Sequence, residues 1–401
     1  MTPDLWPAPV AAAPIDATVR VPGSKSITNR ALVLAAIAES PTVVRQPLVS
    51  RDTELMAAAV RALGADVADV DGDWRVSPQP LRGPARVDVG LAGTVMRFVP
   101  PVAALADGAI TFDGDARARE RPLRPLLDAL RCLGATIDDE GRGALPLTVH
   151  GAGRLAGGTV EIDASASSQL LSALLLAAPR YDKGIEVRHL GARLPSAPFV
   201  ELTVAMLRDR GAAVDVSDDG WSVAPSALTG GEVVVEPDLS SAAAFLVAPL
   251  VAGGALRVAG WPRASLQAGA ATPRVLEAMG ARVDLSDDGL ELSGGGTLAG
   301  VDVDLGDNLE LACVLAAVAA LARELGALGA DVVEHEDSLE IRPAALHGGV
   351  FHTYDDHRLA MAAAVIGLVV PGILVENVAT TGKTYPGFAE QWQSMVDGDT
   401  R

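Results

Sequence analysis

The stretch PGSKSITNR (residues 22–30) runs directly into the apolar segment ALVLAAIA (residues 31–38), and this junction predicts the start of a buried helix. A helix start leaves backbone N–H groups unpaired and carries the positive end of the helix dipole. Lys25 and Arg30 add two cations there, which is unfavourable unless an anion joins them. We therefore expect a bound phosphate or carboxylate at this place. The alternative is an ordinary helix cap with a solvated charge, which explains the hydroxyl residues better than it explains the two cations.

The same kind of junction recurs along the chain and indicates an internal repeat. Further polar or glycine-containing segments each precede an apolar helix, at residues 90–94, 165–169, 238–241, 306–308 and 354–358. Glycines that we expect to end helices in the left-handed conformation follow later in the units, at Gly64, Gly134, Gly211, Gly280 and Gly329. Alternating segments with Asp-Gly turns, such as residues 214–223, then predict β-hairpins. We therefore expect six units of helix, strand, helix, strand and hairpin.

The fifth unit is shorter than the others. The distance from the helix start to the closing glycine is 38 residues in the first unit (26 to 64) and 44 in the third (167 to 211), but 19 in the fifth (310 to 329). We therefore expect that a segment of about 20–25 residues, estimated from the repeat period, is missing between Ala322 and Arg323. The alternative is a truncated, inactive homologue, because loss of a strand opens the core and leaves hydrogen-bonding groups unpaired.

Composition limits the class of protein. The formal net charge of −19 argues against a general nucleic-acid binder, which needs a basic face. The two cysteines, Cys132 and Cys313, lie in apolar helical contexts, and we interpret them as small core residues of a cytoplasmic protein without disulfides. No zinc-ligand spacing and no targeting peptide are evident. The apolar stretch 359–375 is too interrupted for a membrane span, and we expect a buried helix that turns into a strand.

Three motifs carry a resemblance to a known family. Residues 22–31, 90–97 and 355–361 resemble motifs of the 5-enolpyruvylshikimate-3-phosphate synthase family (3-phosphoshikimate 1-carboxyvinyltransferases), and the similarity extends over nearly the whole chain. The resemblance implies a two-lobed inside-out α/β barrel with six internal repeats. Each lobe would hold three βαβαββ units, of which the fifth is incomplete in this chain.

The resemblance also implies domain boundaries and an activity. One lobe, residues 21–236, would bind shikimate 3-phosphate; the other would combine residues 1–20 with 237–401, and the active site would lie in the cleft between them. The family transfers the enolpyruvyl group of phosphoenolpyruvate to the 5-hydroxyl of shikimate 3-phosphate, in chorismate and aromatic amino-acid biosynthesis. A tetrahedral adduct forms and loses phosphate. We expect a cytoplasmic monomer that needs no cofactor or metal and binds neither nucleic acid nor a membrane.

The resemblance assigns substrate contacts residue by residue. Shikimate 3-phosphate is expected at Lys25, Ser26, Arg30, Ser167, Ser168, Gln169, Ser196 and Glu310. Phosphoenolpyruvate is expected at Lys25, Gly93, Thr94, Arg97, Arg121, Arg358 and Lys383. The 5-hydroxyl must lose a proton and the methylene carbon must gain one. The expected catalytic residues are Glu310, Lys25 and Lys383, with Glu310 either activating the hydroxyl or only holding it.

Taken singly, these residues have plainer interpretations. The serines fit helix caps, and Gly93 fits a site of close helix packing. Arg121 and Arg358 fit surface ion-pair partners, the usual role of arginine. His357 fits a buried residue with satisfied hydrogen bonds rather than an acid or a base. Their occurrence at corresponding positions of the repeat is what favours an anion site.

One family motif is absent from this sequence. It has the form His-(Leu/Val)-Arg-x-(Lys/His)-Glu-(Thr/Ser)-Asp-Arg and carries a second acid, a neighbouring basic residue and an arginine. Its expected place falls between Ala322 and Arg323, where the repeat is also short. The chain is therefore expected to catalyse poorly or not at all as it stands, and fully with the segment restored. Leu91 and Phe199 replace an asparagine and a tyrosine that are common in the family. Gly93 is the small residue that, in the family, leaves room for the inhibitor glyphosate, so the resemblance implies sensitivity to it.

Three other functions remain as alternatives. The related UDP-N-acetylglucosamine enolpyruvyl transferases use a cysteine on a mobile loop, and residues 115–121 contain none. A catalytically silent protein that binds shikimate 3-phosphate would follow from a true deletion, and an intact mass above 41.1 kDa would argue against it. A repeat scaffold for protein partners is disfavoured because the distinctive residues gather at helix starts rather than on one outer face.

Overall fold

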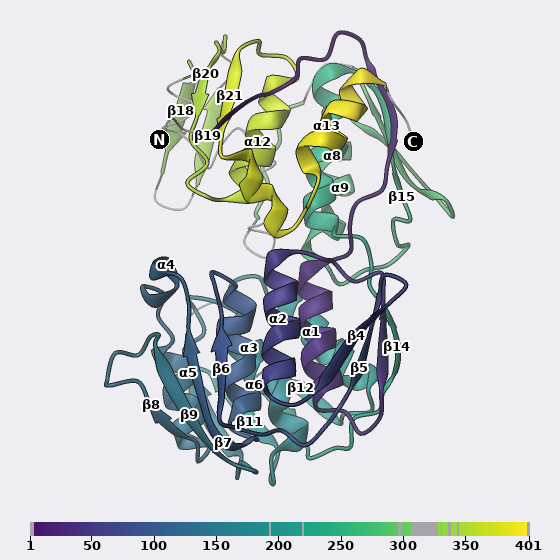
Figure 1. Cartoon of the computed structure of the whole chain (residues 1–401). Helices are drawn as coiled ribbons and strands as arrows, with labels where there is room; N and C mark the ends of the chain where they lie inside the picture. Colours follow the sequence, from purple (N-terminus) through teal and green to yellow (C-terminus); the bar gives the residue numbers. More distant parts are fainter. Residues whose placement is uncertain are drawn as a thin grey trace. The chain divides into compact units, whose positions relative to one another are not determined.

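Two compact units make up the chain (Figure 1). The computed structural model describes residues 4–191, 194–218, 220–295, 299–305, 311, 328–329, 331–335, 338–342 and 345–398. One unit, Gly23–Val235, is continuous in sequence and is called the internal unit below. The other unit, Met1–Pro22 with Glu236–Arg401, is called the split unit. The junction between Ala322 and Arg323, together with Glu310 and Cys313, lies outside the described residues.

The internal unit contains three four-stranded sheets with the same strand order. In each sheet the first two strands are parallel and the other neighbouring pairs are antiparallel. The sheets are β14-β3-β5-β4 (Gly231–Val234, Thr42–Arg45, Asp73–Ser77, Asp66–Val70), β6-β7-β9-β8 (Ala85–Asp88, Asp107–Asp113, Leu147–Ala152, Thr136–Asp138) and β10-β11-β13-β12 (Gly158–Ile162, Ile185–His189, Gly220–Val223, Val214–Ser217). A unit that repeats in sequence thus repeats in topology, although β14 joins the first sheet from the far end of the unit.

Local sequence explains the hairpins and the helix ends. In the β4–β5 hairpin Val70 pairs with Asp73, and the two residues between them, Asp71 and Gly72, have positive φ angles of 56° and 86°. This two-residue loop is the connection that matches the twist of the strands. The glycines predicted to end helices likewise have positive φ angles, from 87° at Gly211 to 118° at Gly64. The sequence prediction for these turns is confirmed.

Three helices of the internal unit are buried along almost their whole length. They are α1 (Lys25–Ala36), α3 (Gly93–Ala103) and α6 (Gln169–Ala177). A helix that is apolar all round has to be covered on every side. In Figure 1 α1 and α3 run alongside α2 (Arg51–Ala62), with strands of the unit on either side. The remaining helices are α4 (Ala116–Arg119), α5 (Arg124–Cys132), η1 (Ala178–Arg180) and α7 (Pro198–Asp209).

The interpretation of Cys132 as a core residue is wrong. Its thiol is free and exposed. Helix α5 buries Leu126, Leu127 and Leu130, and Cys132, two positions after Leu130, falls outside this apolar face because a helix turns about 100° per residue. An apolar sequence context therefore did not decide on which side of the helix the thiol lies.

The split unit repeats the same sheet order once among its described strands. The sheet β2-β15-β17-β16 (Ile15–Val19, Gly254–Ala259, Gly289–Gly294, Arg282–Ser286) has a parallel first pair and antiparallel neighbours. A three-stranded sheet β1-β21-β20 (Leu5–Pro7, Ile373–Glu376, Gly349–Phe351) and a hairpin β18-β19 (Asp331–Glu334, Leu339–Arg342) complete the strands. The helices among the described residues of this unit are α8 (Leu239–Ala252), η2 (Ala268–Ala271), α9 (Thr272–Ala278), α12 (His357–Gly367), η3 (Val378–Lys383) and α13 (Phe388–Asp397).

The apolar stretch 359–375 forms most of α12 and then enters β21, as the sequence predicted. Aromatic side chains fill the core nearby, and the Phe245 ring lies 5.1 Å from Trp392 and 5.4 Å from Tyr385 between centroids. Within the described part of the chain no helix combines the length and the apolar composition that a membrane crossing requires.

Candidate functional site

The first turns of three buried helices meet in the internal unit. Asn29 in α1 donates a hydrogen bond of 2.8 Å from Nδ2 to Oγ1 of Thr94 in α3. Arg97, one turn further along α3, donates from Nη1 to Oε1 of Gln169 at the start of α6, at 2.9 Å. Three helix N-termini are thereby joined by side chains, and each carries unpaired backbone N–H groups and the positive end of a dipole. Such an end favours an anion.

Two arginines converge on Gly93 at this place. A Cβ atom on Gly93 would lie 2.8 Å from Nη1 of Arg97, 3.3 Å from Nη1 of Arg121 and 3.4 Å from Oε1 of Gln169. Arg121 reaches this position from the segment after α4, and its Nη1 donates to the backbone oxygen of Leu91 at 3.3 Å. The absence of a side chain at Gly93 therefore leaves room that both guanidinium groups border. The structure places these predicted residues together.

The electrostatics of the arginine pair favour an anion. Burial and, to a smaller extent, the charge of Arg121 lower the pKa of Arg97 to about 10. Arg97 remains charged at neutral pH, yet its Nε is buried and has no hydrogen-bond partner within the described part of the chain. Two neighbouring like charges are costly, and a phosphate or carboxylate that accepts from both removes the cost through charge-assisted hydrogen bonds.

Lys25 stands at the first position of α1 and faces a carboxylate. Its Nζ lies 3.3 Å from Oδ2 of Asp52, and the two side chains are 21% and 10% exposed. Asp52 lies in the first turn of α2, which begins with a capping box of Ser50 and Thr53. Asp52 was not predicted from the sequence, because an acidic residue in the first turn of a helix is common and carries no sign of a partner 27 positions away.

Arg30 is held inside the internal unit rather than at its surface. The residue is 1% exposed. Its Nε donates to Oγ1 of Thr203 at 2.8 Å, Nη1 to the backbone oxygen of Ser26 at 3.0 Å, and Nη2 to the backbone oxygen of Phe199 at 3.0 Å. The guanidinium carbon also lies 5.2 Å and 5.7 Å from the ring centroids of Phe98 and Phe199. Arg30 thus connects α1 to the start of α7. Its partner Thr203 was not predicted from the sequence.

The predicted serines occupy loops and helix starts of the same unit. Ser167 Oγ accepts a hydrogen bond of 3.3 Å from the backbone N–H of Gln169, so the cap interpretation fits this residue. Ser168 takes the N-cap position of α6 and is 4% exposed, but its side chain makes no capping hydrogen bond. Ser196 is half-buried just before α7 and has a positive φ of 53°, which is uncommon for a residue with a side chain.

In the split unit, Arg358 and Lys383 lie at the same end of α12. Arg358 is its second residue, and its backbone N–H donates at 2.8 Å to Oδ1 of Asp356, the N-cap. Lys383 ends η3, and its Nζ donates at 2.6 Å to the backbone oxygen of Asp355. Nδ1 of His357 lies 3.6 Å from Oδ1 of Asp356. The remaining predicted catalytic residue, Glu310, lies outside the described residues.

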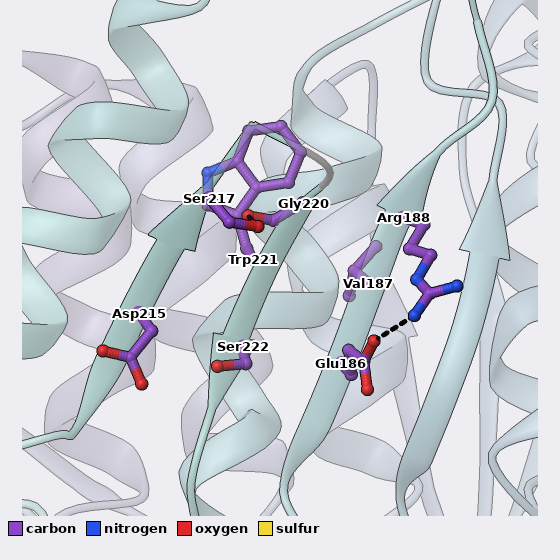
Figure 2. A pocket seen from close by; sticks show the side chains of 8 residues that line it. All are labelled: Glu186, Val187, Arg188, Asp215, Ser217, Gly220, Trp221 and Ser222. Atoms are coloured by element: carbon purple, nitrogen blue, oxygen red, sulfur yellow. Dashed lines mark hydrogen bonds and ion pairs between the residues drawn. The ribbon is translucent and has the colours of Figure 1, made fainter.

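Two cavities of the internal unit lie away from the predicted residues. A cavity of ≈ 510 Å³ is bordered by Ala36 and Ile37 at the C-terminal end of α1 and by Arg180. A groove of ≈ 330 Å³ crosses one face of β11, β13 and β12, where Glu186 pairs with Arg188 (Figure 2). The hydrogen bond from Nη2 of Arg188 to Oε1 of Glu186 measures 2.8 Å. Both are lined by side chains other than those of the helix starts, and we do not assign the site to either.

Comparisons with a family model and with a curated protein match nearly the whole chain to the same enzyme family. A family model described as EPSP synthase (3-phosphoshikimate 1-carboxyvinyltransferase) matches residues 10–323 and 317–392. A 3-phosphoshikimate 1-carboxyvinyltransferase of Kocuria rhizophila is 47% identical over 433 residues, which cover 99% of this chain and 97% of that protein.

Solved structures with the same fold are more distant in sequence. EPSP synthase of Acinetobacter baumannii superposes with a TM-score of 0.80 at 22% identity and covers 97% of both chains. The enolpyruvyl transferase NikO of Streptomyces tendae gives a TM-score of 0.76 at 20% identity, with 96% of both chains covered. At these identities the superpositions show the fold alone.

The matches also bear on the short fifth repeat. The family model matches in two pieces that meet at residues 317–323, a range that contains the junction between Ala322 and Arg323. The alignment with the Kocuria protein spans 433 positions, more than the 401 residues of this chain, so the relative has residues without a counterpart here. Both observations agree with the spacing argument for a missing segment.

Proposed function

Because the chain belongs to the EPSP synthase family, we propose that it transfers the enolpyruvyl (carboxyvinyl) group of phosphoenolpyruvate to the 5-hydroxyl of shikimate 3-phosphate and releases phosphate. The observation that carries this function is the 47% identity to a 3-phosphoshikimate 1-carboxyvinyltransferase over 99% of the chain. The reaction belongs to chorismate and aromatic amino-acid biosynthesis. Residues 115–121, which contain no cysteine, speak against the related UDP-N-acetylglucosamine transferases.

The proposed architecture is the two-lobed inside-out barrel, with six repeats and lobes at residues 21–236 and at 1–20 plus 237–401. The shared strand order of four sheets supports the repeats. The compact units, which change at Pro22–Gly23 and at Val235–Glu236, support the lobe boundaries.

Phosphoenolpyruvate is proposed to bind at Gly93, Thr94, Arg97 and Arg121 of the internal unit, with Lys25 beside them. The convergence of both guanidinium groups on Gly93 supports this assignment. A phosphate or carboxylate there would accept from two arginines and from helix N–H groups at once. Arg358 and Lys383 are proposed to contribute from the split unit.

Shikimate 3-phosphate is proposed to bind at Lys25 and Ser26 of α1, at the segment Ser167–Gln169, at Ser196 and at Arg30. Ser26, Ser167 and Gln169 are partly exposed and supply hydroxyl and amide groups to a polyhydroxylated anion. Because Arg30 is buried, its proposed contribution includes holding Ser26 and the start of α7 in place through the hydrogen bonds described above.

The proposed chemistry requires two proton movements. The 5-hydroxyl oxygen adds to the phosphoenolpyruvate carbon that carries the phosphate and loses its proton, while the methylene carbon gains one. The adduct then expels phosphate, and the methyl carbon that formed from the methylene carbon gives up a proton. Lys25 and Lys383 are the proposed groups of the described chain for proton transfer and charge stabilisation. Glu310 is the proposed base for the hydroxyl.

The missing segment bears on the rate and not on the assignment. The family's second acid and a further arginine belong to the motif that is absent between Ala322 and Arg323, so we propose that the 401-residue chain turns over slowly. The alternative of a silent binding protein is not favoured by the close relative over the full length. We also propose that the protein is a cytoplasmic monomer that needs no cofactor or metal. Membership of the family supports this proposal.

A phosphate-release assay with both substrates tests the function. The chain as it stands should release phosphate only when phosphoenolpyruvate and shikimate 3-phosphate are both present. A variant that carries the corresponding segment of the Kocuria protein between Ala322 and Arg323 should be much faster. If neither protein releases phosphate from this substrate pair, the proposed function is wrong. Intact mass of the natural protein, compared with 41.1 kDa, tests whether the segment is present in the cell.

A further inference from the structure

Three residues with side chains adopt left-handed backbone conformations close to Lys383. Their φ angles are +51° at Tyr354, +59° at Asp355 and +48° at Asn377. Tyr354 and Asp355 come just before the cap of α12, and Asn377 comes just before η3, whose last residue is Lys383. Such conformations cost free energy and persist only where surrounding contacts hold them, often next to a functional group.

Asp355 is the residue that connects the two segments. Its backbone oxygen accepts hydrogen bonds from Nζ of Lys383 at 2.6 Å and from Oγ1 of Thr380 at 2.7 Å. Its side chain accepts at 2.8 Å from Nδ2 of Asn377. The Asn377 backbone N–H in turn donates to the backbone oxygen of Asp4 at 2.8 Å, beside strand β1. One residue therefore receives the lysine amine and is itself held by an asparagine on a sheet-anchored segment.

The left-handed backbone makes this arrangement specific. The conformation of Asp355 sets the direction of its carbonyl, and this carbonyl is where the amine of Lys383 rests. Aspartate and asparagine tolerate the left-handed region better than most residues, because their short polar side chains form local hydrogen bonds. The side-chain hydrogen bond between Asn377 and Asp355 thus supports two strained positions at once.

We propose that Asn377 and Asp355 are positioning residues for the enolpyruvyl transfer: their side-chain hydrogen bond fixes the carbonyl that aims the Lys383 amine at phosphoenolpyruvate. The proposal rests on the proposed function, in which Lys383 contacts that substrate. Asn377 acts through Asp355 and Lys383, and shikimate 3-phosphate recognition does not depend on it.

Asn377→Gly is the first test, because glycine keeps the left-handed backbone and removes only the amide. The kcat/KM for phosphoenolpyruvate should fall roughly 3- to 10-fold, the worth of one hydrogen bond. The KM for shikimate 3-phosphate should not change. Asp355→Asn should stay close to wild type, since its amide oxygen still accepts from Asn377. Asp355→Gly, which cannot accept this bond, should behave like Asn377→Gly.

Glu376→Gln is the matched control. It removes the negative charge from the neighbouring contact between Glu376 Oε2 and His352 Nδ1, which measures 2.9 Å, without touching Asp355 or Lys383. Its kinetic constants should equal those of the wild type. If Asn377→Gly and Glu376→Gln have equal effects, or if both substrates lose affinity alike, the role of Asn377 is general stability and the proposal fails. An undiminished effect of Asn377→Gly in a Lys383→Met background would also overturn it.

A second readout does not depend on activity. Lys25, Lys183 and Lys383 are the lysines of the chain, and their rates of acetylation can be followed separately by mass spectrometry. In Asn377→Gly the rate at Lys383 should rise several-fold and the rates at Lys25 and Lys183 should not change. An unchanged rate at Lys383 contradicts the proposal even when the enzyme is active. If the wild type has no activity but acetylation of Lys383 is faster in Asn377→Gly, only the proposed function is refuted.

Discussion

Gln169 accepts a hydrogen bond of 2.9 Å from Nη1 of Arg97 and so joins the first turn of α6 to α3. The bond keeps a charged guanidinium beside Gly93, where Arg121 also arrives. The neutral amide of Gln169 holds Arg97 without cancelling its charge, whereas a carboxylate at position 169 would neutralise that charge. The positive charge therefore remains available to an anionic substrate.

Gly93→Ala tests the convergence of the arginines. The added Cβ would lie 2.8 Å from Nη1 of Arg97, so this guanidinium and that of Arg121 have to shift. We expect the KM for phosphoenolpyruvate to rise roughly 10-fold or more, which corresponds to about 1.4 kcal/mol, with little change in stability. Glyphosate should inhibit the wild type in competition with phosphoenolpyruvate and the variant less. An unchanged KM, or no inhibition of the wild type at millimolar glyphosate, would contradict this geometry.

Lys25→Met should lower kcat/KM by about 100-fold or more, the loss typical of one charged or hydrogen-bonding group at a transition state. The effect should exceed that of Lys183→Met, because Lys183 is exposed and outside the proposed site. Steady-state phosphate release measures both. Equal kinetics of the two variants would remove Lys25 from the site.

Arg30→Met should destabilise the internal unit by about 2–4 kcal/mol, because it removes the hydrogen bonds that the buried guanidinium donates to Oγ1 of Thr203 and to the backbone oxygens of Phe199 and Ser26. Urea unfolding of the chain measures this change. Arg45→Met is the comparison, since the Arg45 guanidinium also donates to partners, Asp73 and Glu232, but is exposed. The loss in Arg30→Met should be clearly larger; an equal loss would show that burial of Arg30 does not matter.

Asp139→Asn tests a buried carboxylate by pH. Burial pushes the pKa of Asp139 up, but the backbone N–H groups of Gly143 and Gly141 and the Arg131 guanidinium outweigh it, so the pKa lies below its usual value. A lowered pKa stabilises the fold above the unfolded value of about 3.9, and the benefit is lost as the pH falls through the folded pKa.

The free energy of unfolding should therefore be higher for the wild type than for Asp139→Asn at pH 6, and this difference should shrink below about pH 4. Asp128→Asn removes the charge of an exposed partner of the same Arg131 and should have a smaller effect at both pH values. A constant difference from pH 6 to pH 3 would contradict the assignment of charge to Asp139.

The sequence by itself determined the local elements. Helix starts such as the one at Lys25, the left-handed glycines such as Gly64 and the two-residue turn at Asp71 depend on residues a few positions apart, and they were predicted. The spacing of these signals also indicated the repeated unit and its short fifth copy. Family motifs then suggested which helix starts carry the site.

Only the tertiary structure decided the partners of the site residues. Asp52 faces Lys25 from 27 positions away, and Thr203 binds Arg30 from 173 positions away. The exposure of Cys132 and the hydrogen bond between Asp355 and Asn377 could not be predicted from the sequence either. Helix and turn signals are set by neighbours along the chain, whereas burial and long-range hydrogen bonds depend on how distant segments pack, and no local pattern records that packing.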